Sequence, residues 1–111
     1  MRSISLAELY ELYKDTISKC GSYLLNESDN VIIYNIFEEF DVGIISFLHE
    51  ESLIKLFDGG YISADKMKIS LELRNFVLEM QNSGDWNIES FRASEKWKKV
   101  LYLSDKLVNM H

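Results

Sequence analysis

Hydrophobic residues recur with a helical period along most of this chain. In the first segment they return every three or four positions, which places them on one stripe of an α-helix. The stripe consists of Leu6, Leu9, Tyr10, Tyr13, Ile17 and Cys20. Ser5 and Glu8 have the spacing of a capping box, and Gly21 is a suitable stop, so the pattern predicts a helix from residue 6 to residue 20.

Helical spacing resumes after the polar turn NESDN, where Ser28 or Asp29 is positioned to cap the next helix. The predicted inner stripe is made of Ile33, Ile36, Phe37, Phe40 and Ile44. The letters VIIY alone would also suit a strand. Gly43 is expected to bend or interrupt the helix.

A further apolar stripe leads to the glycine pair Gly59 and Gly60. Its members are Ile44, Ile45, Leu48, Leu53, Leu56 and Phe57. We expect one of the two glycines to supply the left-handed residue that ends a helix, because glycine adopts a positive φ without steric cost.

The main ambiguity lies in MKISLELR, from Met67 to Arg74, where apolar and polar residues alternate as in a half-buried strand. The same stretch consists mostly of residue types that favour helices. It also follows a candidate cap at Ser63 and runs into a segment with helical spacing. We therefore predict a helix here and keep a strand as the alternative.

The chain closes on another helical pattern, which follows the polar loop NSGDWN. Its predicted inner face is Trp97, Val100, Leu101, Ser104, Leu107 and Val108. Glu95 lies within reach of Lys98 and Lys99, which gives weak surface support. Together the patterns predict an all-α fold, a compact single-domain bundle of about five helices over residues 1–111. The alternative is an α+β fold with a short strand pair.

Composition favours one folded domain in the cytoplasm. A chain of 111 residues with 47% hydrophobic residues can bury a single core. Glu8 and Glu11 lie where a secretory signal would need an unbroken apolar stretch. The longest apolar run elsewhere, IISFL with its Ser46, is far too short to span a bilayer. We therefore expect a cytoplasmic protein that does not insert into a membrane.

The reactive residue types do not have the spacing of a chemical site. Cys20 is the only cysteine, so an internal disulfide is excluded and a buried apolar role is the simplest interpretation. The two histidines, His49 and His111, are too few for a zinc cluster, and His49 has no assigned role. Glu50 and Glu51 are adjacent, so on a helix they point about 100° apart and cannot share an ion. We expect no catalytic residue, no metal and no cofactor.

One pair of carboxylates keeps an enzymatic hypothesis open. Glu38 and Asp41 are three residues apart, so on a helix they could share a face and act as acid and base. A general acid needs burial to raise its pKa, however, and the predicted stripe leaves both residues on the polar side. A solvated face is therefore the better interpretation.

The charge is unevenly distributed along the chain. Residues 1–60 hold 11 acids and 4 bases, a net charge of −7, whereas residues 61–111 hold 7 acids and 8 bases, a net charge of +1. The total of −6 argues against direct nucleic-acid binding, which needs a basic patch. The acidic half either serves solubility alone or steers the chain onto a basic partner.

The second of these alternatives predicts a partner-binding surface in the stretch from Tyr34 to Ser52, which mixes acids with aromatic residues. Trp86, from the polar loop, either folds back over the core or forms an exposed interface anchor. The candidate partner-binding residues are Tyr34, Glu38, Glu39, Asp41, Phe47, Glu50, Glu51 and Trp86.

Three stretches of the second half, GGYIS, LELRNFVLEM and DWNIESFRASEKWKKVLYLSDKL, carry a resemblance to a known family. The matching residues are Gly60, Tyr61, Ile62, Ser63, Leu73, Arg74, Trp86, Asn87, Ser94, Trp97, Val100, Leu101 and Asp105. They resemble the small immunity proteins of bacterial contact-dependent growth inhibition and related polymorphic toxin systems. Their spacing is similar to a helical group that pairs with uridylate-specific (EndoU-type) ribonuclease toxins. These are mostly core and turn positions, so they support the fold more than the partner.

The resemblance implies a cytoplasmic, non-enzymatic toxin inhibitor that binds its cognate toxin domain in a 1:1 heterodimer. Such a protein blocks either the active site or the path of the substrate. Toxins that cut RNA present basic clefts, which an acidic surface with aromatic side chains complements. The alternative function is a helical adaptor or regulatory module that docks on another cytoplasmic protein.

Overall fold

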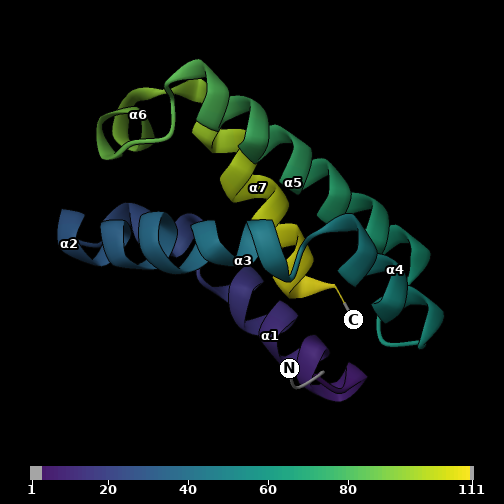
Figure 1. Ribbon diagram of the computed structural model, residues 1–111. Coiled ribbons are helices and arrows are strands. Elements are labelled where there is room, and N and C mark those ends of the chain that lie inside the picture. The colour runs from purple at the N-terminus through teal and green to yellow at the C-terminus, as the bar shows by residue number, and fades with distance from the viewer. Residues whose placement is uncertain (1–3, 111) are drawn as a thin grey trace.

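The computed structural model describes residues 4–110, and most of them are helical (Figure 1). In chain order the segments are α1 (Leu6–Ser18), the 3-10 helix η1 (Ser22–Asn26), α2 (Asp29–Ile32), the π-helix η2 (Ile33–Phe40), α3 (Asp41–Ser46), α4 (Glu50–Asp58), α5 (Ala64–Ser83), α6 (Ile88–Ala93) and α7 (Glu95–Asn109). No strand occurs between residues 4 and 110, so the predicted all-α class is confirmed. The alternating stretch from Met67 to Arg74 lies inside α5, and the strand alternative is wrong.

The helices enclose one hydrophobic core. The longest helix, α5, lies alongside α7, while α1 packs against α7, α4 and the segment from η2 to α3 (Figure 1). The largest fully buried side chains are Trp97, Tyr13, Phe40, Leu24, Ile32, Ile36, Ile44, Leu48, Leu53, Leu56, Leu73 and Met80. Within residues 4–110, no helix combines the length and the apolar composition that crossing a membrane requires.

Serine side chains begin four of the helices. Each accepts a hydrogen bond from a backbone N–H two or three residues later, which satisfies a donor that the helix leaves free. These caps are Ser5, Ser28, Ser63 and Ser94. The predicted capping box of Ser5 and Glu8 is present, and Ser28, not Asp29, caps the second helix. Gly60, with a φ of 80°, is the predicted left-handed residue after α4.

The second predicted helix runs without a break from Asp29 to Ser46, but its central part is π-helical. Large buried side chains recur in it at every fourth position, and Leu48 continues the series just after the helix ends. We call these five residues the buried row: Ile32, Ile36, Phe40, Ile44 and Leu48. In an α-helix each fourth residue turns about 40° past a full turn, so such a row drifts around the axis. The wider turn of a π-helix reverses this drift and keeps the row on the core.

This geometry corrects the predicted inner stripe of the second helix. Ile33 is exposed, and its expected place in the core is taken by Ile32. Phe37 is half-buried at the edge of the core. The predicted stripe assumed α-helical spacing, whereas a π-helical turn begins at Ile33. The prediction therefore placed Ile33 in the core where the structure has Ile32.

Other predicted stripe residues also lie outside the core, namely Ile45, Phe57 and Val108. The stripe through Ile45 assumed one helix up to the glycine pair, but the chain turns between α3 and α4. Val108 lies in the last turn of α7 and is 51% exposed. The short helix α6 lies in a region where the sequence pattern predicted no separate element.

Gly43 does not interrupt the helix, which continues to Ser46, and it allows two helices to approach each other. It is buried in α3, and a Cβ atom on it would collide with the side chain of Thr16 on α1. Thr16 is itself fixed, because its hydroxyl donates a hydrogen bond of 2.8 Å to the carbonyl of Leu12. A residue without a side chain is therefore required where α1 and α3 cross.

We expect Gly43→Ala to lower the free energy of unfolding by roughly 1–3 kcal/mol, because the added methyl group overpacks this crossing. The loss should appear although alanine favours a helix over glycine by about 1 kcal/mol. Chemical denaturation of Gly43→Ala, Thr16→Ala and the double variant measures it. The double variant should lose less than the sum of the single variants, and a neutral or stabilising Gly43→Ala would contradict the steric argument.

Candidate functional site

Acidic residues are frequent in the segment from η1 to the first turn of α4. Between Lys19 and Lys55 the sequence contains no lysine or arginine. The acids in this interval are Glu27, Asp29, Glu38, Glu39, Asp41, Glu50 and Glu51. Arg92, from α6, forms an ion pair of 3.0 Å with Asp29. Glu38, Glu39, Glu50 and Glu51 are exposed and form no ion pair with any residue between 4 and 110.

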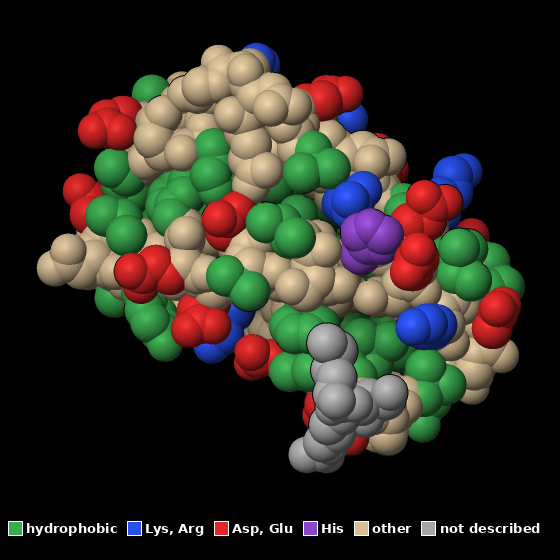
Figure 2. Space-filling view, viewed as in Figure 1, with side chains coloured by type: hydrophobic (Ala, Val, Ile, Leu, Met, Phe, Trp, Pro, Cys, Tyr) green, Lys and Arg blue, Asp and Glu red, His purple; other side chains and the backbone are tan. Residues whose placement is uncertain are grey.

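Exposed apolar side chains alternate with these acids along the outside of the second helix. We call Tyr34, Glu38, Val42 and Ile45 the outer row. The first three each lie two positions before a member of the buried row, about 200° around the helix axis. Tyr34, Val42 and Ile45 are 52%, 58% and 59% exposed. Figure 2 shows acidic side chains set among hydrophobic ones on this face of the molecule.

Tyr34, at the start of the outer row, lies near the carboxylate of Glu39. This carboxylate, near the Tyr34 hydroxyl, raises the pKa of Tyr34 above its usual value. The negative charges of Glu38 and of Asp15, on α1, act in the same direction. An aromatic ring and a carboxylate therefore lie next to each other on the surface.

His49 begins α4 next to two of the predicted acids. Its Nδ1 atom accepts a hydrogen bond of 3.2 Å from the backbone N–H of Glu51, which gives the histidine the role that the sequence left open. Glu50 and Glu51 occupy the first turn, where the helix dipole stabilises negative charge. These two carboxylates therefore serve the start of α4 as well as the surface.

Two predicted contact residues lie against the rest of the fold. Asp41 is half-buried and accepts a hydrogen bond from the side-chain amide of Gln81 on α5. Phe47 is half-buried and packs against the core. Asp41 and Glu38 thus have different surroundings, because Glu38 is exposed on the outer row while Asp41 joins α3 to α5.

Trp86 folds back over the core, the first of its two predicted positions. Its ring stacks on Trp97 with a centroid distance of 4.9 Å and an interplanar angle of 22°, and it meets the edge of Phe37 at 5.4 Å. The neighbouring loop is fixed as well, because the Trp97 indole donates a hydrogen bond of 2.9 Å to the carbonyl of Asp85. Hydrogen bonds from Ser83 and Lys96 hold the pKa of the Asp85 carboxyl below its usual value.

The surface residues that the sequence patterns missed are Val42 and Ile45. One signal was present in the sequence, since Tyr34, Glu38, Val42 and Ile45 recur every three or four positions. The interval from Lys19 to Lys55 without a base was a second signal. Among residues 4–110, no group of three or more His, Cys, Asp or Glu side chains gathers where it could hold a metal ion.

Comparisons with known proteins add no relative to this description. No family model matches the chain, and neither a curated protein nor a solved structure matches it. The function of the chain is therefore inferred from its surface and its sequence.

We expect Trp86→Ala to lower the free energy of unfolding by roughly 2–4 kcal/mol, because it removes a ring that stacks on Trp97 in a partly buried cluster. Trp86→Phe is the matched control, since it keeps an aromatic ring and should cost less than about 1.5 kcal/mol. Chemical denaturation followed by circular dichroism measures both. Equal losses in the two variants would show that the stacked ring contributes little.

Proposed function

We propose that this chain is an immunity-type inhibitor that binds a cognate toxin domain and neutralises it without catalysing a reaction. Its contact surface is the outer row together with Glu39. The observation that carries the proposal is the combination of three exposed apolar side chains with carboxylates that form no ion pair within residues 4–110. The partner that fits this surface best is a basic ribonuclease domain, whose active-site cleft the surface would cover.

The charges on this surface favour rapid association with a basic partner. Clustered charges of one sign raise the rate of encounter with the opposite sign, and the effect weakens as salt screens it. Glu38 and Glu39 are free to form hydrogen-bonded pairs with arginine or lysine of the partner, because no base of this chain between residues 4 and 110 pairs with them. Charge alone steers the encounter but does not hold a complex for long.

The apolar members of the outer row would determine how long the complex lasts. Tyr34, Val42 and Ile45 expose more than half of their surface, so a partner can exclude water from them. Binding energy in protein interfaces is concentrated in a few such anchors, with tyrosine among the most frequent. An apolar centre with a charged rim is also the usual arrangement of a protein interface.

The resemblance of the second half to immunity proteins of contact-dependent growth inhibition supports the same role. Its matching residues lie in α5 to α7 and in the turn at Gly60, and several of them are core residues, such as Trp97 and Leu101. The outer row lies outside these stretches, on the first half of the chain. The finer form of the proposal is a 1:1 complex in the bacterial cytoplasm with an EndoU-type ribonuclease toxin.

We expect Glu38→Lys with Glu39→Lys to weaken binding to the toxin by roughly 100-fold, mainly through slower association. The proposed role predicts that the toxin domain is encoded directly upstream of this gene, and that domain is the test partner. Surface plasmon resonance at two salt concentrations measures the rates, and growth rescue on co-expression reports neutralisation.

The matched control is Glu72→Lys with Glu79→Lys on α5, which changes the net charge by the same amount. Circular dichroism checks that both double variants remain folded. Equal weakening by the two variants would place the interface elsewhere, and a failure of the unmodified chain to rescue growth would contradict the proposed function.

Tyr34→Ala should speed dissociation of the same complex by roughly tenfold or more and leave the association rate nearly unchanged, because an apolar anchor acts after the encounter. Tyr102→Ala on α7 is the control, since Tyr102 is similarly exposed at 57%. Surface plasmon resonance separates the two rates. An unchanged dissociation rate for Tyr34→Ala would remove Tyr34 from the interface.

A further inference from the structure

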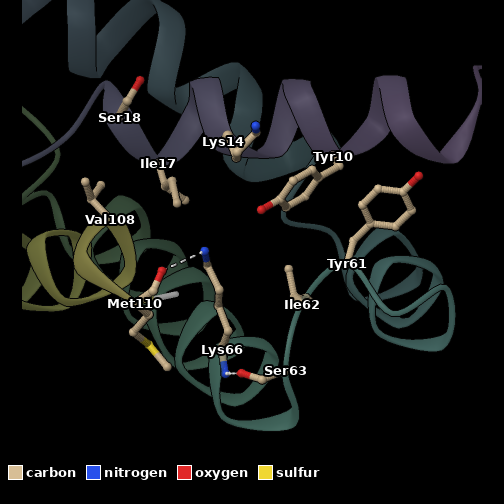
Figure 3. A pocket seen from close by; sticks show the side chains of 10 residues that line it. All are labelled: Tyr10, Lys14, Ile17, Ser18, Tyr61, Ile62, Ser63, Lys66, Val108 and Met110. Carbon is tan, nitrogen blue, oxygen red and sulfur yellow. Dashed lines mark hydrogen bonds between the residues drawn. The ribbon is translucent and has the colours of Figure 1, made fainter.

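A cavity of about 300 Å³ opens between α1, α7 and the first turn of α5 (Figure 3). It lies away from the outer row. Thr16 of α1 contacts α3, whereas Tyr10, Lys14 and Ile17 of the same helix line the cavity. Two lysines, Lys14 and Lys66, line it, and none of its ten lining residues is acidic. In a chain with 18 acids and 12 bases this local excess of positive charge is unexpected.

Within residues 4–110, Lys66 is a buried cation without a carboxylate partner. The residue is only 7% exposed, and it forms no ion pair with the residues from 4 to 110. Its ammonium group donates one long hydrogen bond, of 3.5 Å, to the carbonyl of Met110. Burial, together with the charge of Lys14, lowers the pKa of Lys66. Buried charges in proteins are normally paired, so this ammonium lacks the counter-charge that would stabilise it.

The groups around Lys66 would also favour an anion. The Tyr10 hydroxyl points into the same space as the Lys66 ammonium (Figure 3). Lys14, from the same helix as Tyr10, adds a second positive charge at the rim, although it also forms an ion pair of 3.0 Å with Glu11. The cavity reaches Ser63, the N-cap of the 20-residue helix α5, where the helix dipole is positive.

The remaining walls of the cavity are apolar and aromatic. The rings of Tyr10 and Tyr61 lie 5.1 Å apart, and Ile17 and Ile62 complete this side. Ligand sites typically combine such apolar walls with a few polar groups that fix the orientation of the ligand. A volume of about 300 Å³ suits a small molecule.

We propose that this cavity binds a small organic anion, a carboxylate or a phosphate monoester with an aromatic or aliphatic body. The anionic group lies beside the Lys66 ammonium and the Tyr10 hydroxyl, and the body lies against Tyr61 and Ile62. This ligand site is separate from the proposed toxin-binding surface and does not depend on it.

The test is a titration of the unmodified chain, followed by amide NMR, with phenyl phosphate, benzoate and the uncharged benzyl alcohol. We expect at least one anion to shift the amide signals of Tyr10, Tyr61 and Lys66 saturably, with a Kd near or below ~1 mM, and benzyl alcohol to bind at least tenfold more weakly. Comparing phenyl phosphate with benzoate tells the two anion classes apart. If neither anion gives saturable shifts, or benzyl alcohol binds equally well, the proposal is wrong.

Lys66→Met keeps the apolar stem and removes the charge, so it should weaken anion binding at least tenfold. Lys66→Arg keeps the charge and should retain binding. Lys68→Met is the control, because Lys68 is exposed on α5 outside this cavity. Anion binding by Lys66→Met as tight as that of the unmodified chain would overturn the role of Lys66. The titration of the unmodified chain still decides the proposal if Lys66→Met fails to fold.

Discussion

The wide turn of η2 decides which residues of the second helix reach the core and which face solvent. Five buried residues repeat at intervals of four, and only a mixture of α- and π-helical turns keeps such a row on one side. Burial of this row also determines which residues face solvent on the opposite side of the helix. Tyr34, Glu38 and Val42 are exposed because each lies two positions before a buried residue. A purely α-helical path would rotate part of the outer row toward α1 and break up the candidate surface.

The display of this surface also depends on what lies beneath it. Gly43 allows α3 to rest directly on Thr16 of α1, and Asp41 connects α3 to Gln81 of α5. In the second half of η2, Phe37 and Phe40 pack against the stacked pair of Trp86 and Trp97. The part of the segment from Phe37 to Gly43 is therefore held against the rest of the fold, and a surface held in this way loses little conformational entropy when a partner binds.

Local chemistry made part of this structure predictable from the sequence. The capping box of α1, the serine caps and the left-handed Gly60 involve residues close in sequence, so each could be identified from a short stretch. The turn width of η2 is not local, because it is determined by burial of the row against other helices. The local pattern could place Glu38 and Glu39 on the polar side of the helix. It left Trp86 open between the core and the surface, and it gave no sign of the bond from Asp41 to α5. Lys66 could not be recognised as buried, because only contacts between distant helices create its cavity.

Three of the eight bases in the second half of the chain pair with acids of that same half, so these three do not offset the acidic surface. Lys96 pairs with Asp85, Lys98 with Glu95 and Lys99 with Glu72, all in the second half. Exposed ion pairs of this kind contribute only about 0–1 kcal/mol each to the free energy of unfolding. Their main effect here is on the electric field around the protein. These three ion pairs cancel within the second half, so their lysines do not balance the electric field of Glu38, Glu39, Glu50 and Glu51 on the first half. Exposed carboxylates cost the free chain little stability while water solvates them. They contribute to binding specificity when arginine side chains of a partner replace that water in hydrogen-bonded pairs.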